Sequence, residues 1–117
     1  MEKKDLKPAG VFKYFEEICQ VPRPSKKEEK MIAYLKAFGA KHNLETKVDE
    51  AGYVLIKTPA TPGKENLQTV GLQSHIDMVC EKNNDVQHDF LTDPIETEID
   101  GEWLKAKGTT LGADNGI

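Results

Sequence analysis

The spacing of apolar residues changes period partway along the chain, and this change limits the fold to one class. In residues 8–20, apolar side chains recur three or four positions apart, which is the spacing of one helix face. Residues 25–42 repeat that spacing, and Ser25 with Glu28 three positions later predicts an N-cap and a capping box. From residue 46 onward the period shortens to that of a strand. Helices are therefore expected first and strands after them.

Turn signals predict where the strands pair. Residues 46–49 and 53–57 flank a turn that contains Gly52, and this pattern predicts a first hairpin. Residues 95–99 and 102–106 flank an Asp-Gly pair, the strongest hairpin signal in the chain.

A third strand and a loop are expected between the two hairpins. Residues 68–74 alternate less than an exposed strand would, which favours a strand covered on both faces. Residues 81–94 are polar and irregular, so a long loop is expected, of a kind that often carries function. The order of elements predicts an α/β layered domain, with a mixed β-sheet and helices packed on it.

Composition narrows the functional classes. Among the 117 residues 31% are charged, the net charge is −4 and the two signs are mixed, so no basic face for nucleic acid or polybasic membrane patch is expected. No apolar run reaches the length of a membrane helix or a secretory signal. Cys19 and Cys80 form no CxxC pair and are interpreted as reduced thiols, which favours a cytoplasmic location.

The first candidate for chemistry is His75-Ile76-Asp77, at the expected end of the third strand. Alternation puts His75 and Asp77 on one side of the chain. A neutral imidazole is a good zinc ligand, and a nearby carboxylate can orient it through its other ring nitrogen. Taken alone, this short motif is better explained by a His and an Asp that simply face solvent at a strand end.

The second candidate is Asp114, in the run GADNG at residues 112–116. A carboxylate has two oxygens and can bridge two metal ions, and the flanking glycines permit unusual backbone shapes. Taken alone, this run is better explained by a plain Asp-Asn-Gly turn.

Other roles are expected for the remaining candidates. Core packing is expected for Cys19 and Trp103, and a structural role for Arg23. His42 is expected at a helix C-terminus, and His88 in solvent.

Several runs taken together resemble one family. They are ICQVPRPS at residues 18–25, GLQSHIDMVCEKN at 71–83, HDF at 88–90, DPI at 93–95, and KAKGTTLGADNG at 105–116. These runs strongly resemble the aminoacyl-histidine dipeptidases, which are carnosinase-like enzymes of the co-catalytic zinc metallopeptidase superfamily. The resemblance covers residues 6–117. It implies that these residues are the N-terminal portion of a catalytic domain, with the rest of that domain and a lid domain absent.

The resemblance also implies roles for the candidate residues. It makes His75 a ligand of one metal, Asp77 the catalytic-site carboxylate that orients it, and Asp114 the carboxylate that bridges both metals. It implies a cis peptide bond between Asp114 and Asn115. The implied cofactors are two divalent ions, Zn²⁺ first, with Co²⁺ or Mn²⁺ as alternatives.

The implied reaction is the hydrolysis of small peptides, typically Xaa-His dipeptides. Two ions about 3.5–4 Å apart would activate a shared water. The general base and the remaining ligands of the family are not among these residues, so the chain alone is expected to be inactive. The resemblance leaves a homodimer of a longer form open. The alternatives are a non-catalytic truncated relative that serves binding or assembly, and the related tripeptide aminopeptidases.

Overall fold

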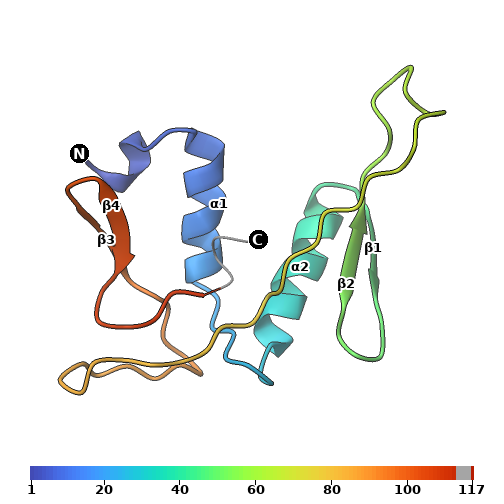
Figure 1. The fold of residues 1–117 in the computed structure, drawn as a ribbon. Helices are drawn as coiled ribbons and strands as arrows, with labels where there is room; N and C mark the ends of the chain where they lie inside the picture. The colour runs from blue at the N-terminus through green and yellow to red at the C-terminus, as the bar shows by residue number, and fades with distance from the viewer. Residues whose placement is uncertain (113–116) are drawn as a thin grey trace. The chain divides into compact units, whose positions relative to one another are not determined.

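The computed structural model describes residues 1–112 and 117 and contains both helices and strands (Figure 1). It divides into two compact units, Met1–Met31 with Ser74–Ile117, and Ile32–Gln73. No helix of the described residues is long and apolar enough to span a membrane. The α/β class is confirmed. The elements are a 3-10 helix at Lys3–Asp5, helices α1 (Ala9–Cys19) and α2 (Glu29–Lys41), and strands β1 (Glu45–Val48), β2 (Val54–Lys57), β3 (Thr97–Asp100) and β4 (Trp103–Ala106).

Both hairpins form where the turn signals predicted them. Strands β1 and β2 pair antiparallel with Val48 opposite Val54, and β3 and β4 pair antiparallel with Asp100 opposite Trp103. In the second turn Gly101 has a φ of +61°, a conformation that glycine adopts without a steric penalty. The strands described thus form two separate antiparallel pairs, and the mixed sheet expected from the sequence is not seen among them.

In the first unit, α1 packs beside the β3–β4 hairpin (Figure 1). The Thr97 hydroxyl donates to Glu16 Oε1 at 2.7 Å, and Lys3 Nζ donates to Glu16 Oε2 at 2.9 Å. The core of this unit is a cluster of buried and partly buried side chains: Cys19, Met78, Ile95, Phe15, Cys80, Phe90, Ala106 and Leu111.

Cys19 is fully buried in this core, which confirms the packing role predicted for it. Burial, with the nearby Glu16 carboxylate, raises the pKa of its thiol to about 11. The thiol therefore stays protonated at neutral pH. Trp103, by contrast, is 75% exposed, so the packing role expected for it is wrong. It lies in β4 at a position that alternates outward, away from the half-buried Leu104.

The second unit contains most of α2 and the β1–β2 hairpin. The helix ends with Asn43 at a φ of +55°, and the Leu44 amide returns to the Gly39 carbonyl at 2.8 Å. This reversal brings β1 against the last turns of the helix. Gly39 is buried there, and a Cβ at that position would meet the Thr46 side chain, with Thr46 Cβ only 3.0 Å away. The close approach of helix and strand therefore depends on the absence of a side chain at residue 39.

Two helical glycines should respond to alanine with opposite signs. Gly39→Ala is expected to lower the free energy of unfolding by about 1–3 kcal/mol, because overpacking at Thr46 outweighs the gain in helix propensity. Gly10→Ala is the matched control, since a Cβ there meets nothing within 4 Å. It should raise the free energy of unfolding by up to about 1 kcal/mol. Urea denaturation followed by circular dichroism tests both. Equal effects of one sign would contradict the close packing.

The second helix begins later than the sequence predicts. The capping box expected at Ser25 and Glu28 does not form, and α2 starts at Glu29. Lys26 has a φ of +70°, which a continuous helix cannot contain. Glu28 Oε1 accepts the Lys26 amide at 2.7 Å instead. Ser25 donates its hydroxyl to a residue far along the chain, which leaves no cap for a helix at that point.

The third strand is also absent. Residues 68–74 form no regular secondary structure and are exposed throughout. Among the described residues no backbone segment pairs with them, so the ladder hydrogen bonds that stabilise a strand are missing. Val70 and Leu72 are 80% and 97% exposed, although the sequence pattern predicted a strand covered on both faces.

Candidate functional site

His75 and Asp77 lie in contact, as their alternation predicted, although the segment that carries them is not a strand. The distance between His75 Nδ1 and Asp77 Oδ1 is 3.0 Å. The His75 side chain is 68% exposed and that of Asp77 is 36% exposed. Within the described part of the chain the other ring nitrogen, Nε2, has no hydrogen-bond partner. The imidazole thus presents one nitrogen to solvent and holds the other against a carboxylate.

Asp77 sets which of the two ring nitrogens carries the proton. A carboxylate can only accept hydrogen bonds, so Nδ1 must donate, and a neutral imidazole then keeps its lone pair on Nε2. The Ser25 hydroxyl, which donates to Asp77 Oδ2 at 2.5 Å, and next the His75 ring hold the pKa of Asp77 below its ordinary value. The carboxylate is therefore charged at neutral pH and remains an acceptor.

Ser25 reaches Asp77 because its own segment runs beside the histidine motif. The Met78 amide donates to the Arg23 carbonyl at 3.0 Å, and the Ser25 amide donates to the Met78 carbonyl at 3.1 Å. These two bonds form a parallel bridge between Pro24 and Met78. Residues 23–25 thus form a short backbone support for the residues that follow His75.

Arg23 joins this support to the second motif. Its side chain is buried, and its guanidinium donates to the carbonyls of Ile18 at 3.0 Å, Val21 at 3.2 Å and Gly112 at 2.8 Å. Burial lowers the pKa of Arg23, but a guanidinium stays protonated in proteins. The structural role expected for Arg23 is confirmed, and it extends to holding Gly112 in place.

Asp114 and the Asp114–Asn115 bond lie outside the described residues. Gly112, two positions before Asp114, is described and lies against Met78, since a Cβ on Gly112 would be 3.1 Å from Met78 Cβ. Met78, three residues after His75, and Gly112, which are widely separated in sequence, therefore meet in the first unit. The sequence offered no signal for either Ser25 or Arg23 as part of this arrangement, because both contacts join distant residues.

The family resemblance implies a metal site, and the described residues provide only some of the side chains that such a site needs. Zinc sites in proteins generally use three or four protein ligands. Among the described residues no group of three His, Cys, Asp or Glu side chains could hold a metal ion. His75 fits one ligand position, because its side chain is 68% exposed and its Nδ1 is fixed by a carboxylate. The described residues therefore fit part of a metal site and not a complete one.

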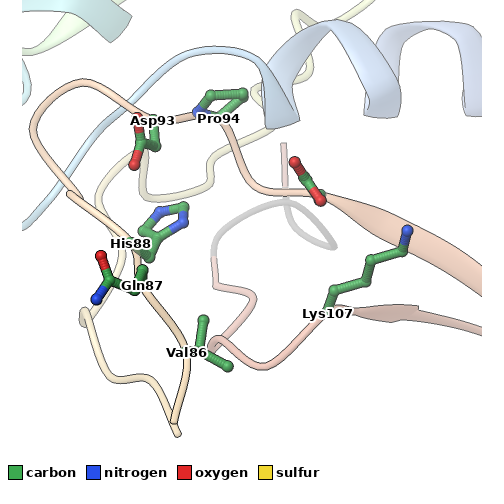
Figure 2. A pocket seen from close by; sticks show the side chains of 7 residues that line it. Val86, Gln87, His88, Asp93, Pro94 and Lys107 are labelled. Atoms are coloured by element: carbon green, nitrogen blue, oxygen red, sulfur yellow. The ribbon is translucent and has the colours of Figure 1, made fainter. Parts of the chain in front are cut away.

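A separate polar pocket lies in the loop predicted to be functional (Figure 2). It has a volume of about 300 Å³ and is lined by Val86, Gln87, His88, Asp93, Pro94, Glu96 and Lys107. Neither His75 nor Asp77 reaches it. His88 was expected to be solvated, but it is partly buried, and its ring lies tilted against that of Phe90 with the two centroids 4.5 Å apart. Its Nε2 is buried and has no hydrogen-bond partner among the described residues. That expectation is wrong because the loop folds back on the core.

Comparison with known proteins found close relatives. The cytosol non-specific dipeptidase of Escherichia coli strain K12 is 48% identical over 116 residues, which cover 99% of this chain and 24% of the relative. The crystal structure of the aminoacylhistidine dipeptidase from Vibrio alginolyticus matches with a TM-score of 0.93 and 51% identity, over 99% of this chain and 24% of that one. No family model matches the chain.

These two matches define the class of protein to which the chain is related. Both relatives are dipeptidases, so the chain is a homologue of part of a peptide hydrolase. The resemblance to the aminoacyl-histidine dipeptidases, inferred from the motifs, is confirmed over nearly the whole chain. The chain spans about a quarter, 24%, of the length of each relative.

Proposed function

We propose that these residues contribute one part of the active site of a metallodipeptidase, which hydrolyses dipeptides that typically end in histidine. The contact between His75 Nδ1 and Asp77 Oδ1 at 3.0 Å supports this proposal most directly. It prepares an accessible imidazole nitrogen for a metal ion, and an ordinary surface histidine lacks such a fixed partner. The names of the two relatives support the dipeptide as the substrate class.

The proposed roles follow from the side chains. His75 would bind one divalent ion through Nε2, Asp77 would hold the ring through Nδ1, and Asp114 would supply a carboxylate shared by two ions. When bound, two such ions would lower the pKa of a water and polarise the scissile carbonyl. Zn²⁺ suits an imidazole and carboxylate site, and so do Co²⁺ and Mn²⁺.

The setting of this activity is also a proposal. A cytoplasmic location is supported by the printed name of the Escherichia coli relative, which includes the word cytosol. The substrate would be a small peptide. The partner proposed for a longer form is a second copy of itself, in a homodimer. Binding to nucleic acid or to a membrane is not proposed, because the net charge is −4 with the signs mixed.

The test compares the chain alone with a chimera. The 117-residue chain is expected not to hydrolyse an Xaa-His dipeptide, because its described residues form only part of a metal site. A chimera in which these residues replace the corresponding 24% of the Escherichia coli dipeptidase is expected to hydrolyse it when zinc is added. Activity is measured as release of free histidine, with and without a chelator.

Each outcome has a clear meaning. Zinc-dependent turnover by the chain alone would show that it contains a complete site, against our expectation. A chimera that folds, as judged by circular dichroism, but hydrolyses nothing in the presence of zinc would contradict the proposed function. In that case a binding or assembly role would become the better explanation.

A further inference from the structure

We propose that Ser25 is a positioning residue that acts on His75 through Asp77. By orienting Asp77, Ser25 determines which ring nitrogen of His75 stays available to a metal ion. The inference rests on the proposed function for its purpose, but its geometry stands independently. The Ser25 hydroxyl donates to Asp77 Oδ2 at 2.5 Å, and Asp77 Oδ1 lies 3.0 Å from His75 Nδ1. The three side chains form one continuous hydrogen-bonded chain.

The two oxygens of Asp77 have different partners, and this division fixes the carboxylate. A carboxylate held at only one oxygen can rotate about its terminal torsion, which is a broad and soft degree of freedom. With Oδ2 held by Ser25, Oδ1 remains directed at His75. A single hydroxyl proton forms one strong bond at a time, and the Met78 carbonyl, at 3.2 Å from Ser25 Oγ, is the more distant acceptor.

Ser25 is itself held independently of its side chain. Its amide donates to the Met78 carbonyl at 3.1 Å, and the preceding Arg23 carbonyl accepts the Met78 amide at 3.0 Å. The backbone therefore places the hydroxyl, and removing the hydroxyl leaves the backbone bridge intact. This separation makes Ser25→Ala an informative substitution.

A role in stability explains this contact poorly. Ser25 is exposed, so its hydrogen bond to Asp77 competes with water and adds little to the stability of the fold. Capping of α2 does not explain it either, since the helix begins four residues later at Glu29. Control of the orientation of Asp77 is the function that the geometry leaves for the hydroxyl.

The test reads the protonation of the His75 ring directly, in the metal-free chain. At a pH about two units above the ordinary histidine pKa, ¹⁵N chemical shifts distinguish a proton on Nδ1 from one on Nε2. The unsubstituted chain should hold the proton predominantly on Nδ1. Ser25→Ala should shift a substantial fraction of it to Nε2, and Ser25→Thr, which keeps a hydroxyl, should restore the original ratio.

Two further variants separate positioning from a general structural effect. Thr110→Val is the matched control, because it removes a nearby hydroxyl that donates to the Val79 carbonyl at 2.7 Å without contacting Asp77. Thr110→Val should leave unchanged the ratio of His75 rings protonated at Nδ1 to those protonated at Nε2. In an Asp77→Asn background, adding Ser25→Ala should change the ratio no further, because Ser25 acts through Asp77.

Several results would overturn the inference. Predominant protonation of Nε2 in the unsubstituted chain would do so without any variant, even if Ser25→Ala failed to fold. An unchanged ratio in folded Ser25→Ala would do the same, as would an equal shift in Thr110→Val. The measurement needs neither metal nor hydrolysis. An inactive chimera would therefore leave this inference standing, and an unchanged ratio would leave the proposed dipeptidase function standing.

Discussion

Replacing Arg23 with methionine is expected to lower the free energy of unfolding by about 3–5 kcal/mol. The guanidinium donates to three carbonyls, those of Ile18, Val21 and Gly112, from a position that is 1% exposed. Methionine fills a similar space but donates nothing. A buried acceptor that loses its partner costs about 1–3 kcal/mol. Such a loss is a large share of the stability of a small protein. Extensive unfolding of Arg23→Met at room temperature would therefore also agree with this prediction.

Two substitutions make the Arg23 measurement specific. Arg23→Lys retains a charge but not the planar fork that reaches several carbonyls at once, so it should be nearly as damaging. Lys30→Met is the matched control, because Lys30 Nζ also donates to a backbone carbonyl, that of Leu91 at 2.6 Å, but from an exposed position. It should change the free energy of unfolding by less than about 1 kcal/mol. Equal effects of Arg23→Met and Lys30→Met in urea denaturation would refute the central role of Arg23.

His75→Ala is expected to abolish measurable zinc-dependent hydrolysis in the chimera and to weaken zinc binding by more than about 100-fold. Removal of a residue that orients a metal ligand typically costs about 10–100-fold, and loss of the ligand itself should exceed that. Asp77→Ala should lower the zinc affinity by about 10–100-fold. Ser25→Ala should lower it only several-fold, because Ser25 acts on His75 indirectly, through Asp77. Zinc affinity is measured by competition with a chromogenic chelator.

The proposed roles predict that zinc affinity falls most in His75→Ala, less in Asp77→Ala and least in Ser25→Ala. A second histidine, His42, provides a control. His42 follows the end of α2, far in sequence from the proposed site, and its ring lies tilted against that of Phe38 with the two centroids 4.4 Å apart. His42→Ala should leave zinc affinity and hydrolysis within about twofold of the parent chimera. If His75→Ala also stayed within twofold, His75 would not be a metal ligand. If Asp77→Ala proved more damaging than His75→Ala, the assigned roles would be reversed.

Local patterns predicted the local structure well. Each hairpin depends on a few adjacent residues, such as the Asp-Gly pair at the turn between β3 and β4, and both formed as expected. The bounds of α1 followed from its apolar spacing. Ser25 was misinterpreted because an N-cap and a distant hydrogen bond require the same serine hydroxyl, and sequence spacing cannot distinguish them. The strand at residues 68–74 was wrong because a strand needs neighbours, and a sequence pattern cannot supply them.

The candidate site was predicted only in part, for the same reason. The pairing of His75 with Asp77 followed from a separation of two residues. The contact of Ser25 with Asp77 spans 52 residues, and that of Arg23 with Gly112 spans 89. No periodicity or turn signal extends over such separations. The predicted role of Asp114 lies outside the described residues and stays a prediction.

The long sequence separation between Arg23 and Gly112 affects the order in which parts of the chain can fold. During synthesis Arg23 emerges 89 residues before Gly112, so its guanidinium must stay hydrated while most of the first unit is still being made. Closing so long a loop carries an entropic cost before any contact compensates for it. We therefore expect the surroundings of His75 and Gly112 to become ordered late and together, even though the helix that precedes Arg23 needs only its own neighbours to begin.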